Sequence, residues 1–281
     1  MGLAFFKAVG DTLVPQNLAK SLWSEDQMHG VALSGALAHT AEQALADLGR
    51  EDLRPARLSV DMFRPARMLP CQLRSEVVRE GPRIVLVDVT LLQEDTAVAR
   101  AGVAFLKPGA NTDGVVWSAN DRPTPPPVET APVGEEPHVP FFESDAGWSQ
   151  NFAEHQSASR KATWQTGIPV VDGEPATPFT AAASIADATS MVCNWGSLGV
   201  EYINTDITLT LSRLPDGLQV GLRSRDRVEN DGIAVGTATV FDRTGPIGTS
   251  VVTALANARR TVDFEQVTFL EDGSRESSPG V

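Results

Sequence analysis

The sequence matches itself at one fixed offset, and this repeat constrains the fold more than any other feature of the chain. Adding 149 to a residue number reaches a residue of the same or a related type at many positions, with no gap. One ungapped offset that runs through a predicted helix, several predicted strands and two turns indicates two copies of one supersecondary unit. The matched pairs include Ala32 with Ala181, Thr40 with Thr189, Arg64 with Arg213, Leu69 with Leu218, Arg74 with Arg223, Glu80 with Glu229, Ile84 with Ile233, Val103 with Val252, and Leu106 with Leu255.

Each half has the pattern of one helix followed by four strands. Apolar residues recur at helical spacing from Gly30 to Leu48, and Gly49 is a suitable C-terminal cap. The following runs are rich in Val, Leu and Ile and are separated by short turns, which predicts antiparallel neighbours. The expected strands are Arg57–Pro65, Cys71–Glu80, Arg83–Glu94 and Ala97–Leu106, and then Glu201–Arg213, Leu218–Glu229, Gly232–Asp242 and Ile247–Arg260, with the second helix near Pro178–Trp195. This order predicts an α+β fold in which each sheet covers its helix.

The two halves are joined by a segment that cannot form regular structure. Residues 107–140 contain many Pro and Gly, including Pro125, Pro126 and Pro127, so we expect a long extended connection. The predicted organisation is a first domain over residues 1–107, a Pro-rich linker over 108–150, a second domain over 151–262 and a flexible C-terminal tail over 263–281.

Composition and charge exclude several classes of function. The net charge is −13, which argues against a general affinity for nucleic acid or for anionic membranes. No apolar run is long enough to span a bilayer, and the ends carry no targeting or lipidation pattern, so we expect a cytoplasmic protein. The four histidines are scattered, and no Cys or His cluster has metal-ligand spacing. We interpret Cys71 and Cys193 as buried, reduced packing residues.

Several segments resemble one known family. Met28-His29-Gly30 at a helix start, followed by the run from Leu58 to Leu106, is similar to the first domain of the acyl-CoA thioesterase II family. Ala186-Asp187-Ala188, the run INTDITLTLSRLPDG, and the turn from Asp242 to Gly248 resemble its second domain, so that the similarity covers about residues 10–260. The resemblance implies a tandem double hotdog fold, each half being a long helix wrapped by a curved antiparallel sheet. It also implies hydrolysis of acyl-CoA to a free acid and CoA, without a metal or a cofactor.

Asp187 is the first candidate for chemistry. It is the only charged residue between Glu174 and Glu201, in a helix of mostly apolar residues that should be buried nearly all round. A buried carboxylate costs several kcal/mol unless it is hydrogen-bonded, and burial tunes its basicity for general-base work. The resemblance implies that this Asp activates water for attack on the thioester. The alternatives are a carboxylate that binds a main-chain donor and one that faces solvent.

The partners of Asp187 are expected on two strands. The resemblance implies a small hydroxyl or amide side chain at Asn204, and Asp206 lies two residues along on the same strand face. Local turn hydrogen bonds are an equal alternative for both. The family's water-holding Gln falls at Val252 or Thr253, depending on register, and this chain has no Gln there. Thr253 offers only a shorter hydroxyl.

The first half does not repeat the acid, because Ala38 stands at the position equivalent to Asp187. His29 and Gly30 open the first helix, where free N–H groups can stabilise a developing oxyanion, although an ordinary helix entry explains them as well. His39 is more simply a surface or packed residue of that helix.

Arginines on the second half are the candidates for binding the CoA phosphates. Arg223, Arg225 and Arg227 alternate along one predicted strand and should share a face, and Arg213 precedes them. An exposed sheet face gives the same pattern. We retain Arg213 and Arg223, with His29, Gly30 and Asp206, as candidate substrate contacts.

Two functional hypotheses remain open. The first is an acyl-CoA thioesterase with Asp187, Asn204 and Thr253 as catalytic residues. The second is a non-catalytic acyl-CoA or acyl-chain binding protein, which the missing Gln favours. A purely structural tandem pair leaves Asp187 unexplained. Acyl-CoA is the expected partner, and assembly into a homodimer or a higher homo-oligomer is left open.

Overall fold

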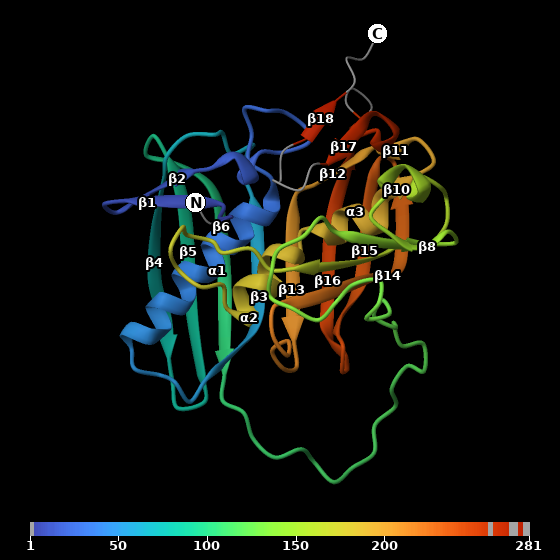
Figure 1. The fold of residues 1–281 in the computed structure, drawn as a ribbon. Coiled ribbons are helices and arrows are strands. Elements are labelled where there is room, and N and C mark those ends of the chain that lie inside the picture. Colours follow the sequence, from blue (N-terminus) through green and yellow to red (C-terminus); the bar gives the residue numbers. More distant parts are fainter. Residues whose placement is uncertain (1–2, 258–260, 270–274, 278–281) are drawn as a thin grey trace.

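One antiparallel sheet carries the architecture of the chain (Figure 1). The computed structural model describes residues 3–257, 261–269 and 275–277. The sheet has 14 strands, and its central order is β4-β5-β6-β3-β13-β16-β15-β14. The first-half strands are β3 (Arg54–Met62), β4 (Cys71–Glu80), β5 (Ile84–Gln93) and β6 (Thr96–Leu106). The second-half strands are β12 (Tyr202–Asn204), β13 (Asp206–Leu211), β14 (Gln219–Asn230), β15 (Ile233–Asp242) and β16 (Gly245–Ala256).

The strand order places the two repeats on either side of one central pair, β3 and β13. Ser59 lies directly opposite Thr208 there, and Thr208 Oγ1 donates a hydrogen bond of 3.3 Å to Ser59 Oγ. These two residues are 149 positions apart and are therefore equivalents of each other in the repeat. An irregularity between Leu91 and Leu92 recurs between Val240 and Phe241 at the same offset. The two repeats therefore share an irregularity of the backbone as well as residue types.

Three helices lie on one face of this sheet. They are α1 (Gly30–Asp47), α2 (Pro178–Ile185) and α3 (Ala188–Asn194). The helix α1 packs on β4, β5 and β6, while α3 packs on β14, β15 and β16. Helices α1 and α2 also pack against each other, and a Cβ atom on Gly35 would lie 2.4 Å from Ser184 Oγ. Only Gly allows the two helices to approach so closely.

The predicted C-terminal end of α1 is confirmed, whereas the predicted second helix is interrupted. Gly49 follows α1 with a φ of 66°, the left-handed conformation expected of a C-terminal cap. The predicted helix near Pro178–Trp195 is interrupted at Ala186 and Asp187, where the main-chain bonds tighten: Asp187 N–H donates to Ser184 O and Thr189 N–H donates to Ala186 O. Bonds to the third preceding residue replace those to the fourth, so α2 and α3 are separate helices.

Short strands that the sequence did not predict extend the sheet at both edges. At one edge the hairpin of β1 (Phe6–Val9) and β2 (Thr12–Pro15) pairs with β4. At the other, β9 (Ala162–Thr166) pairs with β14 and with the hairpin of β7 (Phe141–Ser144) and β8 (Gly147–Ser149). The small elements η1 (Asn17–Ala19), η2 (Phe152–His155), β10 (Trp195–Gly196) and β11 (Gly199–Val200) complete this part.

The predicted linker and the predicted tail both contain short elements of regular structure. Residues 107–140 contain no strand, as expected, but 141–149 form the β7–β8 hairpin, because this part has strand-forming residues and few prolines. The predicted flexible tail includes η3 (Phe264–Gln266) and a pair formed by β17 (Val267–Phe269) and β18 (Arg275–Ser277), whereas 270–274 and 278–281 lie outside the described residues.

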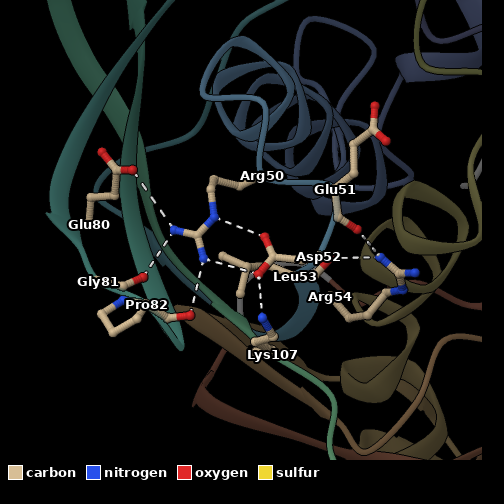
Figure 2. A network of polar contacts seen from close by, with 9 residues as sticks. All are labelled: Arg50, Glu51, Asp52, Leu53, Arg54, Glu80, Gly81, Pro82 and Lys107. Atoms are coloured by element: carbon tan, nitrogen blue, oxygen red, sulfur yellow. Dashed lines mark hydrogen bonds and ion pairs between the residues drawn. The ribbon is translucent and has the colours of Figure 1, made fainter.

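The linker leaves the first repeat at a network of charged residues (Figure 2). The Arg50 guanidinium donates to Asp52 Oδ1 at 2.9 Å and to the main-chain oxygens of Gly81 and Pro82. Lys107, at the start of the linker, lies 3.2 Å from the same Asp52 carboxylate. The network holds the segment after α1, the turn between β4 and β5, and the linker together.

The linker then runs outside the sheet to the second repeat (Figure 1). There Arg243 binds it through hydrogen bonds, and Ala131 packs in one apolar cluster with Trp164. Arg243 donates to the carbonyl oxygens of Pro126 and Ala131, and its guanidinium lies 4.9 Å from the centre of the Trp164 ring. The linker is therefore anchored at defined points in spite of its composition.

Apolar side chains between the helices and the sheet form one core that spans both halves. Cys71 and Cys193 are buried in it as free thiols, as expected. No helix within the described ranges is both long enough and apolar enough to cross a membrane.

Candidate functional site

Asp187 lies at the break between α2 and α3, and β16 holds this break in place. Thr189 Oγ1 donates to Ser250 Oγ at 2.7 Å, and Ser250 is fully buried on β16. The Ser250 hydroxyl in turn contacts the Ala186 carbonyl at 3.5 Å. Since the residues on both sides of Asp187 are fixed in this way, the carboxylate has a defined direction.

The Asp187 carboxylate meets the N-terminus of α1, which belongs to the other half of the chain. A Cβ atom on Gly30 would lie 2.1 Å from Asp187 Oδ1 and 2.8 Å from the Met62 side chain. The Val31 main-chain N–H binds the carboxylate, and Asn204 Nδ2 donates to Asp187 Oδ1 at 3.0 Å. The positive end of the α1 dipole favours a negative charge at this position. The site is therefore assembled from both repeats.

Burial changes the acidity of this carboxyl. Loss of solvent raises the pKa of Asp187 to about 6, while the hydrogen bonds from Asn204 and Val31 act in the opposite direction. A carboxylate in this range is ionised at neutral pH and is more basic than an exposed one, which suits proton abstraction.

His29 serves as the N-cap of α1. Its Nδ1 accepts from the Ala32 N–H at 3.0 Å, and its Nε2 lies 2.7 Å from the Leu18 carbonyl oxygen, to which it donates. Both ring nitrogens are thus engaged in the neutral tautomer with the proton on Nε2. The His29 ring therefore fixes the position of the α1 N-terminus, and any contribution of His29 and Gly30 to a site is made by the main chain at this helix end.

A cavity of about 390 Å³ opens beside Asp187. Its walls are mostly apolar and come from the N-terminal segment, η1 and the residues after it up to 25, linker residues 137–140, Phe142 of β7, α3, and residues 262 and 264. Asp187, Asn204, His29 and Val31 all line it. An apolar cavity of this size with a few convergent polar groups is typical of a small-molecule site. The linker and N-terminal walls could not be predicted from the sequence, because no local pattern connects them with the helix.

Thr253 is not brought to Asp187. Asn204 pairs with Ala254 across β12 and β16, and cross-strand partners share a face. Thr253, one residue before Ala254, therefore points away from α3, whereas Val252 is fully buried on the helix side. Val252 is thus the helix-facing residue of the two candidate positions for the family's amide, and its side chain has no polar atom.

Asp206 stabilises the sheet at the junction of β12 and β13. Its Oδ1 accepts from the Thr253 N–H at 2.8 Å, which replaces a main-chain partner where the strand is interrupted at Thr205. Asp206 does not line the cavity. Donor and acceptor are 47 residues apart in the sequence and lie on neighbouring strands, so this contact differs from the local turn hydrogen bond that was the alternative to a site role.

The predicted arginines are engaged elsewhere. Arg213 makes a two-pronged ion pair with Asp242 at 2.6 and 2.8 Å, and Asp242 is buried. Burial alone would raise the pKa of Asp242, but hydrogen bonds from Arg213, Asp216 and Thr244 hold it well below its usual range. Arg223 binds the linker residue Asp121 at 3.1 Å.

The expected shared face of Arg223, Arg225 and Arg227 is absent. The strand pairing shifts between Ser224 and Asp226, so Arg225 lies in a bulge, and Arg227 instead donates to Asn194 at the end of α3. A bulge inserts one residue and breaks the alternation that the prediction assumed.

The first half has no equivalent site. The positions that correspond to Asp187, Gly30 and Asn204 are Ala38, Phe179 and Pro55, all of them buried and apolar. Phe179 packs edge-on against Phe105, with ring centres 6.4 Å apart. His39 lies 3.3 Å from Glu174 and does not line the cavity. Within the described ranges, no group of three or more His, Cys, Asp or Glu residues is placed to hold a metal ion.

Comparison with solved structures shows the same fold in hotdog thioesterases. The tesB protein of Mycobacterium avium subspecies paratuberculosis has 17% identity and a TM-score of 0.61, covering 89% of this chain and 95% of that one. An acyl-CoA thioesterase II of Mycobacterium marinum has 15% identity and a TM-score of 0.59, with 92% and 95% covered. A conserved protein of unknown function with a hot dog fold, from Alicyclobacillus acidocaldarius, has 16% identity and a TM-score of 0.63, with 91% and 96% covered.

No curated protein matches the sequence. Two family models do match it, and together they cover most of the chain. The acyl-CoA thioesterase N-terminal domain matches residues 19–106, and the acyl-CoA thioesterase C-terminal domain matches residues 118–256. The chain therefore belongs to the acyl-CoA thioesterase family.

Proposed function

We propose that the chain is a tandem double hotdog protein that hydrolyses fatty acyl-CoA to a free fatty acid and CoA. The mirrored strand order about Ser59 and Thr208 supports two hotdog units, one over residues 1–107 and one over residues 151–262, with 108–150 between them. The observation that carries the catalytic part is the Asp187 carboxylate, held at the N-terminus of α1 and lining an apolar cavity.

In the proposed mechanism the acyl chain lies in the apolar cavity and the thioester carbonyl lies at the end of α1. Asp187 takes a proton from a water molecule whose oxygen attacks the carbonyl carbon. The carbon–sulfur bond then breaks, and the proton passes from Asp187 to the leaving CoA thiolate. Asn204 holds Asp187 Oδ1 in position throughout.

The Gly30 N–H is the proposed donor to the developing oxyanion. It has no hydrogen-bond partner among the described residues, while the neighbouring Val31 and Ala32 N–H groups bind Asp187 and His29. A preorganised donor at a helix N-terminus stabilises the charge that forms in the transition state.

One observation favours a second function, binding of acyl-CoA without turnover. Val252 occupies the helix-facing position at which the resemblance implies a water-holding Gln. A valine cannot orient the attacking water. In this case the cavity and the helix end hold the thioester, and the chain acts as an acyl-CoA binding protein.

Thiol release from acyl-CoA substrates of graded chain length distinguishes the two functions. The first function predicts turnover that falls by about 10²–10⁴-fold in Asp187→Asn, because the general base is lost while the side chain keeps its shape. Calorimetric binding of the same substrates should persist in the variant.

Asp113→Asn, in the exposed linker, is the matched control and should keep the wild-type rate. Binding without turnover in the wild type would support the second function. A wild-type rate that Asp187→Asn leaves unchanged would remove Asp187 from the mechanism.

A further inference from the structure

A CoA thioester brings phosphate groups to a chain whose net charge is −13, so its binding needs a local cation. Three of the four arginines that the sequence suggested are engaged by other partners: Arg213 by Asp242, Arg223 by Asp121, and Arg227 by Glu229. The fourth, Arg225, is exposed in the bulge of β14 and does not line the cavity. The next candidates for the phosphates are the cations that line the cavity.

Lys20 is the only Lys or Arg among the described residues that line the cavity. No acidic group of the described chain lies within 4.0 Å of its ammonium group, so no ion pair occupies it. The side chain is partly exposed at the end of η1. An unpaired ammonium group at the edge of an apolar cavity is a suitable partner for a phosphate.

The main chain fixes Lys20 relative to the helix end that holds Asp187. Lys20 pairs with Met28 in an isolated antiparallel bridge, and the carbonyl of the preceding Ala19 accepts from the N–H of His29, the N-cap of α1, at 3.0 Å. Lys20 and the α1 N-terminus therefore belong to one hydrogen-bonded unit. A thioester bound at that helix end lies in the same cavity that Lys20 lines.

We propose that Lys20 binds a phosphate of the CoA moiety at the cavity mouth and so selects CoA thioesters over uncharged ones. This proposal rests on the proposed acyl-CoA site. Glu25 lines the same cavity, and its negative charge opposes the binding of a phosphate there. The two residues should therefore affect CoA binding with opposite signs.

Binding is measured in the Asp187→Asn background, where the thioester is not consumed. The probes are decanoyl-CoA and S-decanoyl-N-acetylcysteamine, which presents the same acyl thioester without phosphates. Lys20→Glu should raise the Kd of decanoyl-CoA about tenfold at low salt, and Glu25→Gln should lower it about twofold. Neither change should alter the Kd of the uncharged thioester.

The exposed Lys7, which does not line the cavity, provides the matched control. Lys7→Glu makes the same change in net charge as Lys20→Glu and should leave both Kd values unchanged. The Lys20 effect should also shrink near 1 M salt, where the Debye length is about 3 Å.

Equal effects of Lys20→Glu on both thioesters, or equal effects of the Lys20 and Lys7 variants on decanoyl-CoA, would overturn the assignment of Lys20. Failure of the wild type to release thiol leaves this binding test intact, because it depends only on Kd. Failure to bind either thioester would instead contradict the proposed acyl-CoA site.

Discussion

Gly30 and Asp187 approach so closely that a side chain on the first excludes the carboxylate of the second: a Cβ atom on Gly30 would lie 2.1 Å from Asp187 Oδ1. The two residues come from different repeats, and the contact joins the start of α1 to the break between α2 and α3. The geometry of the acid therefore depends on the absence of one carbon atom.

Replacing Gly30 by Ala should lower kcat/KM by roughly 10²-fold, because the displaced carboxylate no longer faces the thioester. Overpacking should also reduce the free energy of unfolding by about 1–3 kcal/mol. Thiol release and urea denaturation measure the two effects. Gly109→Ala, at an open position in the linker, is the control and should leave both unchanged. An active Gly30→Ala variant would show that this approach is not needed.

The pH dependence of the reaction should report the acidity of Asp187. Because only the ionised carboxylate accepts a proton, kcat/KM should rise with pH through about 6, the pKa of Asp187, and then level off. The Asn204 hydrogen bond lowers this pKa, so Asn204→Ala should shift the inflection to higher pH. It should also reduce the plateau about tenfold.

A profile of kcat/KM over pH for both proteins makes this comparison. An inflection that stays in place in Asn204→Ala would assign the titration to another group.

Asp187 should reduce the stability of the fold at neutral pH. Its pKa in the folded chain is about 6 against an ordinary value of 3.8, so the folded state binds the proton more tightly than the unfolded state. Stability should therefore fall as pH rises from about 4 to about 6 and then stay constant, a loss of at most about 3 kcal/mol. Asp187→Asn lacks this loss.

Urea denaturation of both proteins at several pH values measures the difference. Above about pH 6, Asp187→Asn should have a larger free energy of unfolding than the wild type. A difference between the two proteins that stays constant from about pH 4 to about pH 6 would contradict the prediction.

Arg213 should matter for stability and have no effect on CoA binding. Truncation to Ala leaves the buried Asp242 carboxylate without its ion-pair partner, which should cost about 2 kcal/mol at neutral pH. The pKa of Asp242 is lowered in the folded chain, so its stabilising contribution is present above its unfolded pKa and is lost as the pH falls toward its folded value.

Thermal or urea unfolding detects this cost, and the exposed Arg225→Ala serves as the control. A selective rise in the KM for acyl-CoA in Arg213→Ala, without loss of stability, would instead restore Arg213 as a substrate contact.

Local pattern predicted the repeated elements well. The strands β4, β5 and β6 and the end of α1 follow from apolar runs, turn residues and the Gly49 cap, which are properties of neighbouring residues. The hairpins at the sheet edges were missed because strands of three or four residues, such as Gly147–Ser149, are too short for an alternation to show.

The sequence named Asp187, Asn204 and the His29–Gly30 helix start as candidates, and the structure brings these residues together, but the cavity walls could not be predicted. A single charge in an apolar helix singled out Asp187, but its contact with Gly30 joins distant parts of the chain, which no local pattern reveals. The break at Asp187 contains no Gly or Pro and so gave no signal. The predicted shared face of the arginines was wrong, because one inserted residue at Arg225 shifts the strand pairing. Lys20 could not be predicted as a site residue, because an isolated lysine in a loop has no distinctive sequence pattern.

The α1 N-terminus and Asp187 belong to one polypeptide, and this has a consequence for how activity depends on protein concentration. A site shared between two separate subunits is lost when the subunits dissociate on dilution. Here the α1 N-terminus and Asp187 are covalently linked. The specific activity of the proposed enzyme should therefore not depend on protein concentration. The linkage also allows the two halves to differ: the positions equivalent to Asp187 and Gly30 hold the buried packing residues Ala38 and Phe179, so each chain carries one such carboxylate among its described residues.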